Sequence, residues 1–240
     1  MYRPAPEQIA TYRDQGYVVL PGLIDRDRVA TLAANVATVL ATRNQPESYL
    51  AQTAEYLADS PIDALVNDPG LAAVAGDLLG GTARVYLPFT AVKGAGRGAF
   101  GFHQDNQYTE LDGPACNIWL ALANVTPTSG CLRLVPGSHR AGTLPSRAMF
   151  EDGSHRSVVD DPVDAVDVSL APGDAVVFDR LCVHGSGPNR SDLPRVGYAV
   201  QFHREDVRWN GAGTWRLLAD HPRWQTGPVA ALSDQAGQGE

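Results

Sequence analysis

Lysine is almost absent from this 240-residue chain. Lys93 is the single lysine among 19 basic residues, and all the others are arginines. Acidic residues outnumber basic ones by 27 to 19, which gives a formal net charge of −8. Proteins that bind nucleic acids usually present a basic patch, so this balance predicts no nucleic-acid partner. An arginine-rich composition accounts for the shortage of lysine but leaves the position of Lys93 unexplained.

Cysteine and long apolar runs are scarce as well. Cys116, Cys131 and Cys182 are odd in number and lack the spacing of metal-binding or redox pairs. We therefore expect reduced thiols and a cytoplasmic location. No segment approaches the roughly 20 apolar residues of a membrane-spanning helix, and residues 1–4 open no apolar run. We expect neither a membrane span nor a signal peptide.

The length allows one large domain or two small ones, and we predict a single domain. A chain of 240 residues with 44% hydrophobic residues can bury a full core without disulfide bonds. We predict a helical N-terminal part over residues 1–81, a β-rich core over 82–205 and a C-terminal extension over 206–240. We expect a monomer or a homodimer.

Periodicity and capping residues predict the helices of the N-terminal part. We predict helices at 7–15, at 26–41 after Asp25, and from Pro69 to the stop at Gly80, with a short apolar strand at 17–20. Asp68 before Pro69 is a cap followed by a proline in the first helical turn.

From residue 82 the chain changes to short segments rich in β-branched and aromatic residues, bounded by Gly, Pro, Asn and Asp. We predict strands at 84–92, 99–105, 116–123, 131–135, 166–170, 175–178 and 195–203. Regularly spaced short strands are typical of a sandwich or barrel, and their number fits a jelly roll. The fold class is therefore mainly β, with the helices covering one sheet from outside.

A long polar stretch, residues 138–165, separates two of these strands. Loops of this length in a compact domain are usually functional lids or disordered segments. With Arg140, Arg147, Met149 and Phe150, it is our candidate for a lid that sets substrate specificity.

His103 and Asp105 are the most informative pair, with one residue between them in a predicted strand. Residues i and i+2 of a strand point to the same face, about 6.6 Å apart, so an imidazole and a carboxylate can converge on one metal ion. His184 could supply a third ligand. Two histidines and one carboxylate form the facial triad of non-haem Fe(II) oxygenases, which leaves metal positions open for substrate and O₂. His-x-Asp alone is common by chance and could equally be a structural pair.

Arg195 follows His184 across residues 185–194, a segment typical of a loop. The chain can fold back there, so that Arg195 opens a neighbouring antiparallel strand and faces the same cavity. An arginine beside a metal ligand suits a carboxylate that also touches the metal, because its guanidinium is a rigid two-pronged donor. Arg195 could otherwise form a surface ion pair.

Several segments match a known family in order and spacing. They are Phe102-His103-Gln104-Asp105-Asn106-Gln107-Tyr108, Trp119-Leu120-Ala121-Leu122, residues 130–139, Pro172-Gly173-Asp174, and His184-Gly185-Ser186 through Asn189 to Arg195. Together they resemble the phytanoyl-CoA dioxygenase-like Fe(II)/2-oxoglutarate oxygenases over about residues 7–205. The resemblance implies a double-stranded β-helix (a cupin-like jelly roll) and hydroxylation of a small molecule, with release of succinate and CO₂.

The resemblance also implies cofactors and roles for single residues. The cofactors are Fe(II), 2-oxoglutarate and O₂. The iron ligands of the family correspond to His103, Asp105 and His184. Arg195 resembles the arginine that binds the distal carboxylate of 2-oxoglutarate, Ser186 resembles the hydroxyl partner of that arginine, and Trp119 and Lys93 match residues beside this cosubstrate. Gln104 and Tyr108 are weaker candidates for substrate contacts. Taken alone, Ser186 could be a turn residue, Trp119 core packing and Lys93 an exposed cation.

Asp105 discriminates between outcomes. Halogenases related to this family carry a small residue at this position, so the carboxylate implies oxygen insertion or another non-halogenating oxidation. Two other classes stay open: a zinc hydrolase, because two histidines and a carboxylate also bind Zn²⁺ with an activated water, and a non-catalytic small-molecule-binding barrel. The sequence does not name the primary substrate, or separate hydroxylation from desaturation, epoxidation or ring closure.

Overall fold

The computed structural model describes residues 1–42, 59–149, 156–160 and 162–220. One sheet contains β1 (Tyr17–Leu20), β2 (Ala83–Lys93), β4 (Ala115–Ala121), β9 (Ala175–Asp179) and β11 (Arg195–Arg204). A second sheet contains β3 (Phe100–His103), β5 (Leu132–Leu134), β8 (Val166–Val168) and β10 (His184–Ser186). The helices are α1 (Pro6–Gln15), α2 (Arg26–Thr42), α3 (Pro61–Val66) and α4 (Pro69–Leu79).

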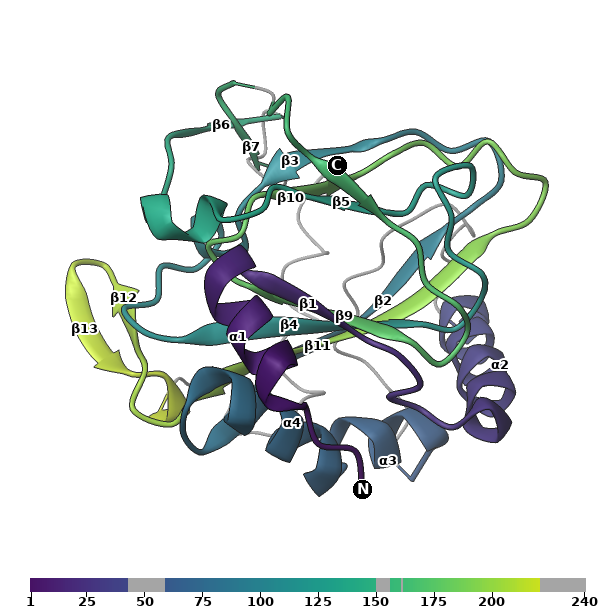
Figure 1. Cartoon of the computed structure of the whole chain (residues 1–240), viewed down its shortest axis with the longest axis horizontal. Coiled ribbons are helices and arrows are strands. Elements are labelled where there is room, and N and C mark those ends of the chain that lie inside the picture. Colours follow the sequence, from purple (N-terminus) through teal and green to yellow (C-terminus); the bar gives the residue numbers. More distant parts are fainter. Residues whose placement is uncertain (43–58, 150–155, 161, 221–240) are drawn as a thin grey trace.

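The two sheets face each other, and the helices cover the outer side of the larger one (Figure 1). The strand order is β1-β9-β4-β11-β2 in the larger sheet and β3-β10-β5-β8 in the smaller, and all of these strands pair antiparallel. Neighbouring strands are therefore far apart in the chain, as in a double-stranded β-helix. The predicted jelly roll with external helices is confirmed.

Alternation along β11 separates two cores. Tyr198 and Val200 pack with the helices, whereas Ala199 packs in the core between the sheets. Because successive strand residues point to opposite faces, Arg195 and Gln201 share the inner face with Ala199. Buried polar side chains are thereby directed into the space between the sheets.

Capping residues define two of the helices. The Asp68 side chain accepts a hydrogen bond from Gly70 N at 2.8 Å, and α4 ends at Gly80 with a positive φ of 73°. Both ends agree with the prediction. The short helix α3 was not predicted, although Ser60 caps it by accepting from Asp63 N at 3.2 Å.

The strand prediction was wrong at Asp105. Strand β3 ends at His103, and Asp105 begins the 3₁₀ helix η1 (Asp105–Gln107). Gln104 between them is extended, with φ −115° and ψ 137°. One extended residue is enough to direct the side chains of His103 and Asp105 to the same side, so the spacing argument holds although Asp105 lies outside the strand.

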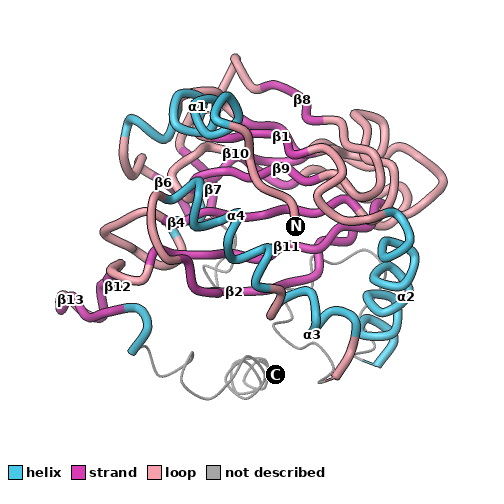
Figure 2. The backbone as a smooth tube through the Cα atoms, turned by 60° about the horizontal axis from the view of Figure 1, so that its bottom comes forward, coloured by secondary structure: helices cyan, strands magenta, loops and turns pink. Residues whose placement is uncertain are grey.

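The segment expected to be one long loop contains regular structure. It includes the 3₁₀ helix η2 (Ser138–Ala141) and a small sheet of β6 (Ser146–Ala148) and β7 (Arg156–Val158), while Phe150 lies outside the described residues. Past the core, β12 (Arg208–Gly211) and β13 (Thr214–Leu217) form a hairpin before the 3₁₀ helix η3 (Leu218–Asp220). This hairpin projects from the edge of the molecule (Figures 1 and 2).

A search for membrane-crossing segments is negative: among the described residues, no helix has the length and apolar character that a bilayer requires.

Candidate active site

Three side chains predicted to bind a metal converge between the two sheets. His103 at the end of β3 is the cross-strand partner of His184 at the start of β10, and their ring centroids are 4.2 Å apart. Asp105 Oδ1 lies 3.8 Å from His103 Nε2 and 3.6 Å from His184 Nε2. All three side chains are buried, and one ligand atom of each lies within 4.8 Å of the others.

Backbone carbonyl groups orient both imidazoles. His103 Nδ1 lies 2.9 Å from Gly101 O, and His184 Nδ1 lies 3.0 Å from Cys182 O. A carbonyl oxygen only accepts, so each Nδ1 carries the proton and each Nε2 keeps its lone pair. Two imidazole lone pairs and a carboxylate oxygen therefore point at one place. Such a donor set repels itself without a cation, and it fits a divalent metal ion.

Two amides hold the other oxygen of the metal-facing carboxylate. Asp105 Oδ2 accepts from Gln201 Nε2 at 2.8 Å and from Asn117 Nδ2 at 3.4 Å. Sequence reasoning missed both residues. The signal was present, because each amide interrupts an otherwise apolar strand, and a buried polar side chain in such a place requires a partner.

A second cluster lies on the inner face, where β2 and β11 are paired. Lys93 and Arg195 are cross-strand partners, and they are only 4% and 2% exposed. Lys93 Nζ donates to Ser186 Oγ at 2.7 Å and to Gly187 O at 2.5 Å. The structure thus brings together three residues that the sequence placed at the cosubstrate. Lys93 is not an exposed cation.

Arg195 is held by one hydrogen bond and one ring. Its Nη1 donates to Gly130 O at 3.1 Å, and its guanidinium carbon lies 5.0 Å from the ring centroid of Trp119. Its buried Nε has no hydrogen-bond partner among the described residues. Strand β11 belongs to the larger sheet and β10 to the smaller, so Arg195 faces the site of His184 across the barrel and not from a neighbouring strand as predicted.

The two cations are buried without a carboxylate: within the described ranges, neither forms a salt bridge. Burial, reinforced by the charge of Arg195, lowers the pKa of Lys93 to about 7. Burial also lowers the pKa of Arg195 to about 10. Positive charge that is desolvated and unpaired favours binding of an anion, and a carboxylate can use the free donors of the guanidinium.

Trp119 is fixed against the backbone of β11. A Cβ atom added at Gly197 would overlap Cζ2 and Cη2 of the indole, so the ring occupies space that only glycine leaves. The ring is 3% exposed and also belongs to the core between the sheets. The Trp119 side chain therefore both packs in the core and contacts Arg195.

The two weaker substrate candidates differ. Gln104 is fully buried, and its amide donates to Gly142 O and Leu181 O and accepts from Leu144 N. These bonds use the amide for holding loops, which argues against a substrate contact. Tyr108 is 39% exposed, and its ring centroid lies 5.7 Å from that of His103.

The predicted lid segment is tied to the metal site. The Tyr108 hydroxyl accepts from Arg156 N, the first residue of β7, at 3.1 Å. Arg140 points elsewhere, because its guanidinium binds Asp14 of α1 at 3.1 Å. Arg147 lies in β6, and Met149 is 48% exposed. The described part of the lid segment therefore reaches the metal site at two places, where β7 contacts Tyr108 and where Gly142 and Leu144 contact Gln104.

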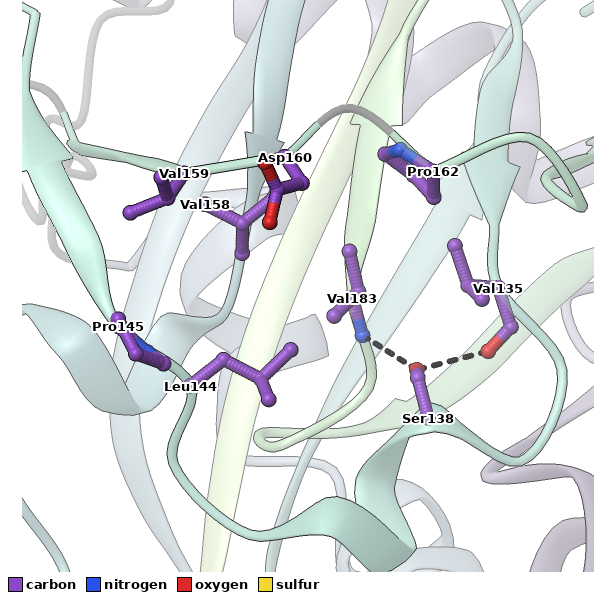
Figure 3. A pocket seen from close by; sticks show the side chains of 9 residues that line it. All are labelled: Val135, Ser138, Leu144, Pro145, Val158, Val159, Asp160, Pro162 and Val183. Carbon is purple, nitrogen blue, oxygen red and sulfur yellow. Dashed lines mark hydrogen bonds between the residues drawn. The ribbon is translucent and has the colours of Figure 1, made fainter.

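The same segment encloses a small apolar pocket of about 210 Å³. Its lining comes mostly from residues 138–162, with Val135 and Val183 from the ends of the smaller sheet (Figure 3). Ser138 Oγ closes one side by accepting from Val183 N and donating to Val135 O, both at 2.8 Å. Val183 immediately precedes His184, and its side chain lines this pocket. None of the three candidate ligands lines this pocket.

A jelly roll with a buried triad of two histidines and one carboxylate between its sheets is the fold and site of the non-haem Fe(II)/2-oxoglutarate-dependent oxygenases. Residues 12–197 match the family model of phytanoyl-CoA dioxygenase (PhyH). The chain belongs to the phytanoyl-CoA dioxygenase family.

Individual relatives agree with this assignment. A probable phytanoyl-CoA dioxygenase of Caenorhabditis elegans is 32% identical over 114 residues, which cover 44% of this chain and 36% of that protein. The chain thus spans little more than a third of that relative's length. A methylphosphonate hydroxylase of Gimesia maris is 26% identical over 201 residues, covering 78% and 76% of the two chains.

A solved structure is similar over most of the fold. EvdO2 of Micromonospora carbonacea var. aurantiaca, crystallised with 2-oxoglutarate, is 25% identical with a TM-score of 0.68. The similarity covers 84% of this chain and 91% of that one.

Proposed function

We propose that this protein is an Fe(II)- and 2-oxoglutarate-dependent dioxygenase that hydroxylates a small molecule and releases succinate and CO₂. The observation that carries the proposal is the combination of a buried metal triad with two buried cations that have no carboxylate partner among the described residues. Lys93 and Arg195 supply positive charge for the carboxylate of a dicarboxylic cosubstrate. The metal that this cosubstrate contacts would receive its ligand atoms from His103, Asp105 and His184.

The chain's own residues divide the work. His103, Asp105 and His184 would hold Fe(II) from one side, which leaves positions for other ligands. When bound, Fe(II) supplies activation of O₂ at the expense of 2-oxoglutarate. Arg195 would receive the distal carboxylate on its free guanidinium edge. Because both cations are removed from water, they attract an anion more strongly than exposed cations would.

Ser186 and Trp119 complete the cosubstrate pocket. The Ser186 hydroxyl accepts from Lys93 Nζ and can donate its own proton to a carboxylate. The Trp119 ring packs against the guanidinium of Arg195, whose carbon lies 5.0 Å from the ring centroid, and would limit its movement. A fixed donor set loses little conformational entropy when its ligand binds.

Substrate would enter beside Tyr108 and the β6–β7 sheet. Tyr108 is an exposed aromatic residue whose ring centroid lies 5.7 Å from that of His103, and its hydrogen bond with Arg156 connects it to the lid segment. A lid attached in this way can exclude water while substrate is present. Gln104 would keep the neighbouring loops in place without touching substrate.

Zinc hydrolysis on the same triad is the alternative reaction. A Zn²⁺-bound water needs only the metal ligands and a general base, and it gives no role to two buried cations. A small-molecule-binding barrel without turnover would equally leave the ordered triad unexplained. The cation pair therefore favours the oxygenase over the hydrolase, and the triad favours it over the barrel.

Domain number, oligomeric state and location are part of the proposed function. We propose one catalytic domain that works as a monomer or a homodimer in the cytoplasm. The three cysteines are all buried and free, which agrees with a reducing compartment. Light scattering coupled to gel filtration measures the number of subunits.

The test is metal-dependent turnover of the cosubstrate. The purified protein, stripped of metal and reconstituted with Fe(II), should consume 2-oxoglutarate and O₂ and form succinate, and the rate should rise when the true substrate is present in a panel of small molecules. The Zn²⁺-loaded protein should form none. Succinate formation that does not depend on iron, or hydrolysis that depends on Zn²⁺, would overturn the proposal.

A further inference from the structure

A buried chain of hydrogen bonds leads away from the metal-facing carboxylate. Gln201 Nε2 donates to Asp105 Oδ2 at 2.8 Å, and Arg180 Nη1 donates to Gln201 Oε1 at 3.2 Å. Asp105, Gln201 and Arg180 are 8%, 5% and 3% exposed. Water therefore competes little for these bonds, and each partner depends on the next.

Arg180 is itself fixed in place. Its Nη2 donates to Asp105 O at 3.0 Å and to Thr109 O at 2.9 Å, and its guanidinium carbon lies 5.0 Å from the ring centroid of Tyr86. Within the described part of the chain it forms no salt bridge. This buried cation thus donates through its two Nη atoms to one amide and to two backbone carbonyls, those of Asp105 and Thr109, and its buried Nε has no hydrogen-bond partner among the described residues.

The chemistry of the three groups leaves one orientation for the amide. An amide has an accepting oxygen and a donating nitrogen, whereas a guanidinium can only donate and a carboxylate can only accept. Oε1 of Gln201 must therefore face Arg180, and Nε2 must face Asp105. Reversing the amide would place a donor against a donor at one end and two acceptors together at the other.

The consequence falls on the carboxylate. Its Oδ2 is occupied by Gln201, with Asn117 Nδ2 as a more distant second donor at 3.4 Å. Its Oδ1 remains directed at the two imidazole Nε2 atoms, 3.6 and 3.8 Å away. The amide donors set which oxygen of Asp105 is offered to a metal and limit rotation of the carboxylate.

We infer that Gln201, oriented by Arg180, is a positioning residue for the metal ligand Asp105. The inference rests on the proposed function in so far as Asp105 binds a metal. It extends the metal site beyond the triad by two residues, Gln201 from β11 and Arg180 from the turn after β9. Outer-shell partners of metal ligands typically contribute about 10–100-fold to metal affinity.

The experiment measures Mn(II) binding to the metal-free full chain, with free Mn(II) quantified by its EPR signal. Gln201→Met keeps the length of the side chain and removes both hydrogen bonds, and it should weaken Mn(II) binding by about 10–100-fold. Asn117→Leu removes the longer bond and should have a smaller effect. Equal affinity of Gln201→Met and the wild type would overturn the inference.

Val200→Ala is the matched control for a merely structural role. Val200 is adjacent to Gln201 but packs with the helices, so its truncation should lower the unfolding temperature and leave Mn(II) affinity unchanged. At saturating Co(II), the visible ligand-field bands should shift in Gln201→Met and stay unchanged in Val200→Ala. If Gln201→Met and Val200→Ala lose Mn(II) affinity and stability to the same extent, Gln201 only supports the fold.

Arg180 is tested through its dependence on Gln201. Arg180→Met should weaken Mn(II) binding more in the wild-type chain than in the Gln201→Met background, because contacting residues are coupled. Strict additivity would remove Arg180 from the inference. A wild-type chain that binds no Mn(II) would overturn the proposed function itself, an outcome separate from unchanged affinity in the variants. If Gln201→Met does not fold, the Mn(II) affinity and the Co(II) bands of Arg180→Met decide, because this variant removes the group that orients the Gln201 amide.

Discussion

Lys93 and Arg195 are cross-strand partners on β2 and β11, and the structure buries both of their charges on the same inner face. Two like charges removed from water destabilise a fold unless an anion joins them. Within the described residues no carboxylate does so. Local destabilisation of this kind is typical of binding sites that a ligand completes.

Loss of the guanidinium should separate cosubstrate binding from metal binding. A charge-assisted hydrogen bond contributes about 1.5–3 kcal/mol, so Arg195→Met should raise the Kd of 2-oxoglutarate by roughly 10–150-fold. Mn(II) affinity, measured by EPR, should not change. Arg133→Met is the control, because Arg133 pairs with Asp167 at 3.1 Å on the partly exposed strands β5 and β8. An unchanged Kd for Arg195→Met would assign the carboxylate to another residue.

Cosubstrate affinity should fall with rising pH. Burial and the charge of Arg195 lower the pKa of Lys93 to about 7. A bound carboxylate would raise this pKa again, because an opposite charge favours the protonated form. Above about pH 7, 2-oxoglutarate must therefore bring in a proton, so binding is tightest below this pH and weakens towards pH 9. Calorimetric titration of the Mn(II)-loaded protein between pH 6.5 and 9 measures this slope. Lys93→Met should bind more weakly at pH 6.5 and lose most of the slope, and a flat wild-type profile would exclude Lys93 from the pocket.

The same lysine should make the ligand-free fold less stable at neutral pH. Its ammonium titrates near 10.4 in an unfolded chain but near 7 in the fold. Between these values the unfolded state binds more protons, so the free energy of unfolding rises with pH. Below about pH 7 the full destabilisation is present. Lys93→Met should therefore be more stable than the wild type at pH 6.5, by urea denaturation, and the difference should shrink at pH 9. A less stable variant at pH 6.5 would contradict this sign.

Space at Gly197 should matter for the cosubstrate site. A methyl group there overlaps the indole of Trp119, which in turn packs on Arg195. Gly197→Ala should displace the ring, lower the unfolding temperature and raise the Kd of 2-oxoglutarate, with Mn(II) affinity retained. Gly213→Ala, in the β12–β13 turn, controls for loss of stability alone. Wild-type cosubstrate affinity in Gly197→Ala would show that Trp119 does not position Arg195.

Much of the barrel was predictable because its strands are short segments rich in β-branched and aromatic residues, bounded by Gly, Pro, Asn and Asp. The apolar segments that became β4, β9 and β11 were placed to within a few residues. Strand β10 was missed because His184-Gly185-Ser186 is three residues long and contains no apolar residue. The short strands β6 and β7 were hidden for a similar reason inside a polar stretch.

The metal triad was predictable from residue type and spacing, whereas its support was not. Extended backbone at Gln104 preserved the His-x-Asp geometry even though Asp105 had left the strand. Nothing in the sequence says that Gln201 and Arg180 meet, since the barrel brings together β11 and the turn after β9. The two opposing sheets likewise place Arg195 across the barrel from His184. The sequence had predicted the two residues on neighbouring strands.

The central claim is that one ferrous ion and one molecule of 2-oxoglutarate bind together between the triad and the cation pair. Anaerobic addition of Fe(II) and then 2-oxoglutarate, followed by visible absorption spectroscopy, tests this directly. The account predicts a charge-transfer band that appears only with both components and is absent in His184→Ala. Folded wild-type protein that binds Fe(II) but gives no such band with saturating 2-oxoglutarate would contradict it.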